Sequence, residues 1–348
     1  MTLITKDPQM ARRLALSVGF AGTPDQTKDL IQRIKIAEEV GVEAVFTAET
    51  WGRDQFSLLT QVALQTEKIK LGTGIAPVYG RSPAVLAMTY ATLDELSGGR
   101  VIIGLGTSGA RVIEHWHGQP FEKPLQRIKE YCEIINLIIA GEKVFYDGEI
   151  FKLQRGFKLL FNPVRNHIPI YIASIAPKSM QIVGEVADGW MPIYWPKSKF
   201  RDGLATVQKG SARAGRDAGA VECIASLTTV IDEDPARAKR LAAGPVSWYV
   251  TNMGDFYHRM LTRNGFGPQV AAMRQAGEEH KPMPFQTHDE LMAAMGDEML
   301  DETAIYGDLE TVALGIEERR QLGVDLPVIG MPQGDLKRLE RVLGTLVS

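Results

Sequence analysis

The chain has 348 residues, a length that fits either two or three ordinary domains or one large barrel. Hydrophobic residues make up 45% of the sequence and charged residues 23%, which excludes a disordered or fibrous protein. The 39 lysines and arginines nearly balance the 42 aspartates and glutamates, for a net charge of −3. Such a charge attracts neither a nucleic-acid backbone nor an anionic membrane, so we expect no nucleic acid and no membrane as partners.

The cysteine count indicates a reducing compartment, and the apolar runs are too short for a secretion signal or a membrane span. Cys132 and Cys223 are too few for a disulfide framework or a cysteine-based zinc site, and we expect both in the core of a cytoplasmic protein. Arg12 and Arg13 precede an apolar stretch over residues 14–20, but it is short and has no small-residue cleavage site, so we expect no secretion signal. No apolar run approaches the roughly 18 residues that a membrane span needs.

Strand and helix patterns alternate from the start of the chain. The predicted pairs are strand 14–20 with helix 26–40, strand 42–47 with helix 56–68, strand 70–75 with helix 83–96, and strand 101–105 with helix 124–140. A hairpin is predicted over 143–153, with its turn at Asp147 and Gly148. Such alternation predicts parallel strands joined by crossover helices.

The alternation resumes after the hairpin. The predicted elements are strand 169–173 with helix 177–186, strand 189–193 with helix 200–214, strand 222–231 with helix 235–243, helix 309–322, strand 326–330 and helix 335–346. Residues 248–300 contain helical pieces but no predicted strand. Eight strand–helix units predict an α/β fold, a (β/α)8 TIM barrel that forms a single domain over 1–348 with insertions near 107–168 and 245–300, after strands four and seven.

A doubly wound sheet is the structural alternative, because Gly104 to Gly109 form a literal G-x-G-x-x-G. That fingerprint belongs after the first strand, with an acidic residue about 20 positions further on at the end of the next strand. Here the glycines follow the fourth strand, and the next strand comes only after a long helix and a hairpin. We therefore interpret them as a place where the backbone approaches a bound ring or phosphate.

Small and aromatic residues recur where the strands end, at the face where barrel enzymes build their active sites. The informative strand ends are 19–20, 49–54, 74–77, 106–109, 173–178 and 189–195. Ordinary turn chemistry explains any one of them, but their convergence fits a flat ring with a phosphate tail. Ser174 to Lys178 would hold the phosphate at a helix start, and a plain helix cap is the alternative.

Charged residues near these loops also have ordinary explanations. Glu49, Arg53 and Asp54 are equally compatible with a surface ion pair. His115 and His117 stand at a spacing that suits a metal, but no third ligand is near them in the sequence, so we expect no metal site.

Three segments together resemble a known family. Residues 46–54, 71–79 and 96–106 are similar to the luciferase-like monooxygenase superfamily, and within it to the branch that uses the deazaflavin coenzyme F420, which includes the methylenetetrahydromethanopterin reductases. The Ser-Gly-Gly-Arg segment from Ser97 to Arg100, before an apolar strand, is the most specific of these matches. The resemblance spans nearly the whole chain and is weakest over 245–300.

The resemblance implies a cofactor site at the strand ends. The ring would lie over a bulge held by a non-proline cis peptide at Gly74-Ile75. The residues implied at the cofactor are Glu49 and Thr50 at the polar edge of the ring, Gly74, Ile75 and Ala76 beneath it, Gly106, Thr107, Ser108 and Gly109 along the tail, Ala173, Ser174, Ile175, Ala176, Pro177 and Lys178 at the phosphate, and Trp190.

The resemblance also implies a function: hydride transfer between F420 and a small organic substrate. An FMN-dependent monooxygenase is the first alternative, and a flavin-binding protein without activity is the second. The reductases carry a glutamate in strand one, where this chain has Ser17 or Gly19, which argues against a pterin substrate. Candidates for handling the proton are Glu49, Tyr79, Glu114, His115 and His117.

Two further expectations concern the substrate and the assembly. The substrate would lie against the segment 245–300, and Trp195, Trp248, Tyr249, Met253 and Phe256 indicate an apolar, aromatic pocket. Similar proteins are commonly dimers, so we expect a homodimer.

Overall fold

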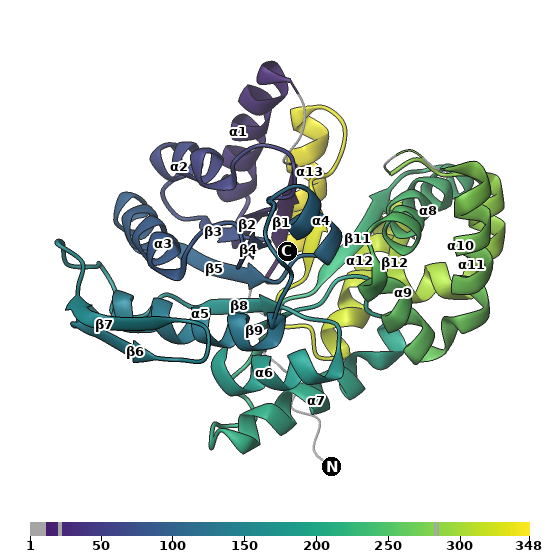
Figure 1. Cartoon of the computed structure of the whole chain (residues 1–348). Coiled ribbons are helices and arrows are strands. Elements are labelled where there is room, and N and C mark those ends of the chain that lie inside the picture. The colour runs from purple at the N-terminus through teal and green to yellow at the C-terminus, as the bar shows by residue number, and fades with distance from the viewer. Residues whose placement is uncertain (1–11, 20–22, 282, 284) are drawn as a thin grey trace, which may run out of the picture.

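The computed structural model of the protein describes residues 12–19, 23–281, 283 and 285–348 (Figure 1). Parallel strands form its centre, and helices surround them. In order around the sheet, the strands are β1 (Ala15–Val18), β2 (Ala44–Thr47), β3 (Lys70–Thr73), β5 (Val101–Gly106), β8 (Ile170–Ala173), β9 (Gly189–Met191), β10 (Glu222–Cys223), β11 (Ser226–Ile231) and β13 (Val328–Gly330). No helix in these described ranges is long and apolar enough to cross a membrane.

The segment 222–231 closes the sheet into a barrel. Its first part, β10, pairs with β9, and its second part, β11, pairs with β13, which in turn pairs with β1. Between these parts the ladder continues, because Ile224 N donates to Trp190 O at 2.8 Å and Val328 N donates to Ala225 O at 2.8 Å. The predicted (β/α)8 barrel is confirmed, and β10 and β11 together are its predicted seventh strand.

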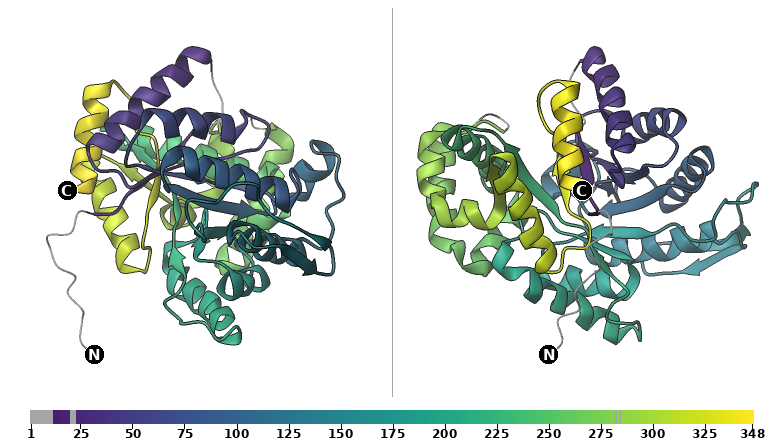
Figure 2. Two further views of the ribbon diagram at one scale, coloured as in Figure 1. Left: turned by 90° about the vertical axis from the view of Figure 1, so that its left-hand side faces the viewer. Right: turned by 180° about the vertical axis from the view of Figure 1, so that it is seen from behind.

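Helices cover the outside of the barrel (Figure 2). They are α1 (Pro24–Glu39), α2 (Gln55–Gln65), α3 (Pro83–Ser97), α5 (Pro124–Ile139), α6 (Pro177–Val186), α7 (Phe200–Arg213), α12 (Leu309–Gln321) and α13 (Leu336–Val347). The first three begin after Thr23, Asp54 and Ser82, whose side chains accept a backbone N–H of the first turn. These polar caps explain why the helices start where the apolar periodicity starts.

Two separate apolar clusters fill the two faces of the strands. Leu16, Val45 and Ile103 belong to the cluster between the strands and the helices, whereas Ala15 and Phe46 belong to a cluster inside the barrel. Because both faces of the strands are buried, their sequences are continuous apolar runs rather than alternating ones.

The predicted hairpin is present and projects from the barrel. It consists of β6 (Val144–Asp147) and β7 (Lys152–Phe157), which pair antiparallel. The prediction placed the second strand over 149–153, whereas β7 begins later because the backbone of 149–151 bonds to the carboxylate of Glu130 on α5.

A layer of helices lies beside the barrel, at the right of Figure 1. It contains α8 (Pro235–Asn252), α9 (Asp255–Leu261), the π-helical turn η2 (Thr262–Phe266), α10 (Gly267–His280) and α11 (Asp289–Thr303). These helices share an apolar cluster of their own, which includes Met260, Met273, Met295 and Met299. These four methionines are therefore core residues of this layer.

The helical layer departs from the sequence prediction at two places. The predicted helix ends at residue 243, whereas α8 continues through Pro245 to Asn252 because its flanks, Gly244 and Val246, are buried in the core. The strand β12 (Ala304–Gly307) was not predicted. It follows α11 without a turn and pairs with β11 over Thr228 to Ile231.

Candidate cofactor and substrate site

The strand ends surround an opening at one end of the barrel. Side chains alternate along a strand, so Ser17 shares the inward face of β1 with Ala15, yet Ser17 is exposed. Ile75 and Ala173 pack on the inward cluster and are half-buried, so a ligand has access to them from the opening. The strand end predicted at Phe20 lies outside the described residues.

A bulge after β3 forms one wall of this opening. The peptide bond between Gly74 and Ile75 is cis, and Gly74 N donates to Thr47 O at 2.7 Å. A Cβ on Gly106 would lie 2.8 Å from the Ile75 side chain, which explains the glycine there. Ala76, in the two-residue strand β4 (Ala76–Pro77), is fully buried towards the helices. Its side chain is therefore not open to the barrel mouth, and a contact of Ala76 with the cofactor stays a prediction for its backbone.

Glu49 is part of an ionic network. Arg81 donates to both oxygens of Glu49, at 2.6 and 2.9 Å, and also to Asp54 at 2.5 Å. Gln55 Nε2 donates to the same carboxylate of Glu49 at 2.9 Å. The hydrogen bond to Glu49 is the main cause that raises the pKa of Arg81. The sequence placed Glu49 and Asp54 in a possible ion pair, but it did not identify Arg81 as their cation.

Thr50, the residue after Glu49, offers an unpaired hydroxyl. Thr50 Oγ1 is buried and has no hydrogen-bond partner among the described residues. Buried polar atoms in proteins nearly always have a partner, so this hydroxyl is available to a bound ligand. The next residue, Trp51, is 49% exposed.

The loop after β5 lies next to this wall. The backbone of Ser108 has φ 56°, a left-handed conformation that residues other than glycine seldom adopt. Thr107 Oγ1 donates to Ser108 O at 3.2 Å. A Cβ on Gly109 would have one neighbour within 4 Å, Met253 O at 3.8 Å, so there is space above this glycine. The predicted tail residues Gly106 to Gly109 therefore line open space in part.

The start of α6 is the predicted phosphate site. Its N-cap residue Ala176 makes no side-chain capping bond, and Lys178 is exposed. Ser174, by contrast, is 6% exposed, and its hydroxyl lies 2.6 Å from the hydroxyl of Ser179. Ser174 is thus already paired within the protein, which makes the backbone and Lys178 the accessible donors.

Arg263 is a residue at this site that sequence reasoning missed. It comes from the π-helical turn η2, and its Nη2 donates to Ile175 O at 3.0 Å. The guanidinium group thus lies against the loop that leads into α6. Nothing in the local sequence signals this contact, because 88 positions separate the two residues.

Trp190 does not lie at the site. It is 0% exposed and packs edge-on against Trp195 and Phe200, on the side of the strands that faces the helices. Its Nε1 donates to Ser174 O at 2.8 Å. These contacts correct the prediction of a cofactor contact and give Trp190 a supporting position behind the start of α6.

The candidates for handling the proton have different surroundings in the structure. The Tyr79 hydroxyl donates to Glu122 O at 2.8 Å, and burial raises the pKa of Tyr79, so its proton stays committed to the main chain. His117 lies near Gly80, with a buried Nε2 that has no partner in the described part of the chain. His115 faces the pocket described below. No group of three or more possible metal ligands occurs among the described residues.

A pocket of about 360 Å³ opens beside Gly109. Its lining includes Trp51, Arg111, His115, Trp116, Trp248 and Met253. The residues come from the loop after β2, from the region of the short helix α4 (Ala110–His115) and from the end of α8. Of the five residues predicted to border a substrate pocket, Trp248 and Met253 line this one, whereas Trp195, Tyr249 and Phe256 do not.

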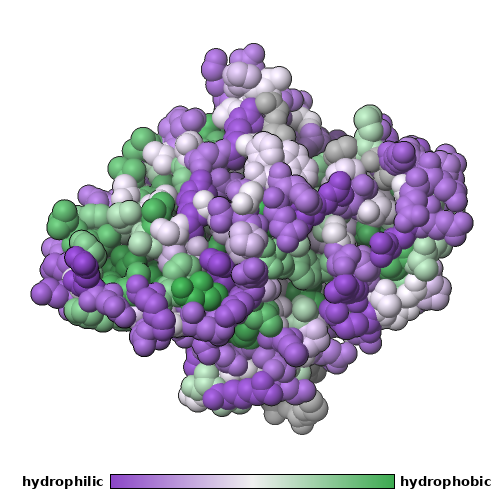
Figure 3. Space-filling view, viewed as in Figure 1, coloured by the Kyte–Doolittle hydropathy of each residue, from purple (hydrophilic) through white to green (hydrophobic). Residues whose placement is uncertain are grey.

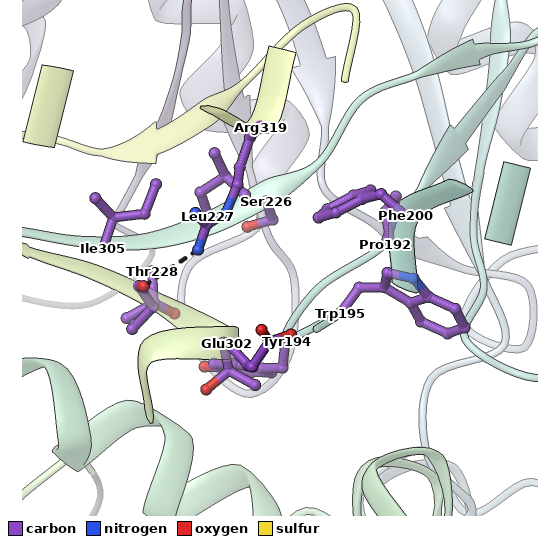
Figure 4. A pocket seen from close by; sticks show the side chains of 12 residues that line it. Pro192, Tyr194, Trp195, Phe200, Ser226, Leu227, Thr228, Glu302, Ile305 and Arg319 are labelled. Atoms are coloured by element: carbon purple, nitrogen blue, oxygen red, sulfur yellow. Dashed lines mark hydrogen bonds between the residues drawn. The ribbon is translucent and has the colours of Figure 1, made fainter. Parts of the chain in front are cut away.

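A second, much smaller cavity lies away from this opening (Figure 4). Arg319 extends into it towards Thr228 and Ile305, and its Nη2 donates to Ala304 O at 3.5 Å. Its volume of about 10 Å³ has room for roughly one water molecule, so this cavity is no substrate site.

Comparisons with known proteins identify the family of the chain. The profile of the luciferase-like monooxygenase family matches residues 12–326. The chain is similar to the 5,10-methylenetetrahydromethanopterin reductase of Archaeoglobus fulgidus, with 33% identity over 94% of this chain and 98% of the relative. It is also 31% identical, over 91% of this chain and 94% of the relative, to a Mycobacterium tuberculosis protein named provisionally as a coenzyme F420-dependent oxidoreductase.

A solved structure gives the same result. The coenzyme F420 dependent tetrahydromethanopterin reductase of Methanopyrus kandleri superposes with a TM-score of 0.82 and 25% identity, over 97% of this chain and 98% of that one. The family profile covers most of the chain, including every barrel strand except the last. The chain belongs to the luciferase-like monooxygenase family.

Proposed function

We propose that this protein is a coenzyme F420-dependent oxidoreductase that transfers a hydride between the deazaflavin and a small organic substrate. The observation that carries the proposal is the full-length likeness, in sequence and in fold, to the F420 dependent reductase of Methanopyrus kandleri. The similarity to the Mycobacterium tuberculosis protein, which is named for the same cofactor, supports the proposal.

The residues at the barrel mouth fit a flat ring with an anionic tail. The unpaired Oγ1 of Thr50 suits a polar ring edge, and the space above Gly109 suits a chain that leads away from the ring. Lys178 and Arg263 supply positive charge at the uncapped start of α6. The cofactor contacts implied by the resemblance are therefore kept in the proposal, without the side chains of Ala76 and Trp190.

The chemistry divides between cofactor and protein. A bound deazaflavin supplies a ring carbon that gives or takes a hydride and reacts poorly with oxygen. The protein would orient the ring against the Gly74–Ile75 bulge, and Arg81 holds the Glu49 side chain at the polar edge through two hydrogen bonds. Because Glu49 and Tyr79 are committed to other groups, we propose His115 as the residue that moves the proton to or from the substrate.

The substrate itself belongs in the aromatic pocket beside Gly109. The resemblance implies a glutamate in strand one of the reductases, where this chain has Ser17 or Gly19, so we leave a pterin substrate out of the proposal.

A parallel titration of the purified protein with F420 and with FMN tests the cofactor. We expect F420 to bind at least tenfold more tightly than FMN, as seen by quenching of cofactor fluorescence. Tighter binding of FMN would move the protein to the monooxygenases. F420 binding without turnover of any reducible substrate would favour a cofactor-binding protein without activity. Binding of neither would overturn the proposal.

We also propose a homodimer, formed through an apolar surface over α3 and the hairpin, at the left of Figure 3. A groove of about 510 Å³, lined by Met88 and Val144 among others, lies there beside Phe157 and Leu160, which are 79% and 102% exposed. A twofold contact needs a surface that complements itself, and a groove next to protruding apolar side chains meets that need.

We propose the cytoplasm as the location of the protein. Cys132 and Cys223 are both free and fully buried. Burial raises the pKa of each thiol far above its ordinary value, so neither serves as a nucleophile. Free thiols of this kind fit a reducing compartment.

A further inference from the structure

The pocket beside Gly109 is unusually rich in indole rings. Trp51 follows β2, Trp116 follows α4, and Trp248 lies on α8, so three separate segments each bring one tryptophan to the same cavity. Trp51 and Trp116 are 49% and 64% exposed, which leaves much of their faces uncovered. Exposed indole faces bind flat rings by stacking.

Arg111 gives the pocket a positive charge. Arg111, in the first turn of α4, lines the pocket, and its Nη1 donates to Asn252 O at 3.3 Å, which is a neutral acceptor. Within the described part of the chain, the hydrogen bond to Asn252 O is the polar contact of Arg111, no ion pair joins it to a carboxylate, and no carboxylate lines the pocket. A guanidinium beside aromatic walls, with no counter-ion from the protein, is suited to an anionic group of a ligand.

We propose that this pocket takes a substrate with a flat ring body and a carboxylate, and that Arg111 binds the carboxylate while the tryptophans hold the ring. This inference rests on the proposed function, because the pocket is a substrate site only when the cofactor occupies the neighbouring loops. The anionic tail of the cofactor could bind Arg111 in the same way as a substrate carboxylate. The experiment therefore has to distinguish a substrate carboxylate from the cofactor tail.

The probes are 2-naphthoate and its neutral counterpart 2-naphthamide, titrated against the full-length protein by tryptophan fluorescence, with and without F420. We expect naphthoate to bind about tenfold more tightly than naphthamide, since a hydrogen bond between two charged groups is stronger than one to a neutral amide. Arg111→Gln should remove this preference, and Arg111→Lys should keep part of it. Trp116→Ala should weaken both probes equally, and Arg201→Gln, on the distant helix α7, should change neither.

Each result decides between the sources. Equal affinity for the two probes in the unmodified protein, or an unchanged preference in Arg111→Gln, overturns the inference. If F420 displaces naphthoate, and Arg111→Gln weakens F420 by the same factor, Arg111 serves the cofactor tail and the substrate assignment is overturned. Simultaneous binding of F420 and naphthoate supports it. Failure of F420 to bind, with the naphthoate preference intact, overturns the proposed function instead.

Discussion

Arg263 connects the helical layer to the predicted phosphate site through its bond to Ile175 O. We predict that Arg263→Gln weakens F420 binding by about five- to tenfold, because one charge-assisted contact to the phosphate is lost. Arg259→Gln is the matched control, since Arg259 bonds to Asp255 at 2.7 Å in the same layer and is 64% exposed. A fluorescence titration of both variants measures the effect, and equal affinities would remove Arg263 from the site.

The residues of the site differ in how far the sequence could predict them. Thr50 and Gly109 were predictable because they stand at strand ends, where the fold itself places them at the mouth. Arg81 and Arg263 were not, because their partners are distant in sequence and depend on how loops pack. Trp190 was misplaced because one position along a strand turns a side chain from the inside of the barrel to the outside.

At the level of elements, Glu130 anchors the hairpin to α5. Its buried carboxylate accepts hydrogen bonds from Gln126 and from the backbone of residues 149–151. The fit is close, because a Cβ on Gly148 would lie 2.4 Å from Glu130 Oε2. Burial by itself raises the pKa of Glu130, but these hydrogen bonds outweigh burial and lower it below its ordinary value of 4.5.

This lowered pKa predicts how stability depends on pH. The folded state binds the proton less well than the unfolded state, so Glu130 stabilises the fold above about pH 4.5, and this contribution is lost as the pH falls below that value. We expect Glu130→Gln to lower the free energy of unfolding by about 2–4 kcal/mol at pH 7, and by less at pH 4. Urea unfolding at both values measures the difference.

The control for this prediction is Glu149→Gln. Glu149 pairs with Lys123 at the surface, where both side chains are more than half exposed, so its loss should change stability little at either pH. A Glu130→Gln variant that loses as much stability at pH 4 as at pH 7 would contradict the assignment.

Elements were predictable where the local pattern and the tertiary packing agree. The barrel strands were found because apolar runs alternate with capped helices. The extension of α8 past Pro245 and the short strand β12 escaped prediction, since a buried core overrides the proline and no turn residues separate Thr303 from Ala304.

At the scale of the whole molecule, the proposed dimer predicts an effect on assembly. Phe157→Glu places a charge in the apolar surface over α3 and the hairpin, so we expect the dimer to dissociate at micromolar concentration in sedimentation velocity. Leu314→Glu is the control, because Leu314 is 65% exposed on α12, on the other side of the molecule. A monomeric unmodified protein, or a dimer that survives Phe157→Glu, would overturn this interface.

The strand β11 belongs to two ladders at once. Ser226 and Leu227 pair with β13 and close the barrel, whereas the residues from Thr228 onward pair with β12, which continues directly from the helical layer. The barrel and the layer therefore share one continuous backbone segment. A fluctuation that opens the layer has to break hydrogen bonds beside the closing seam of the barrel, which makes the two regions a single cooperative unit in local unfolding.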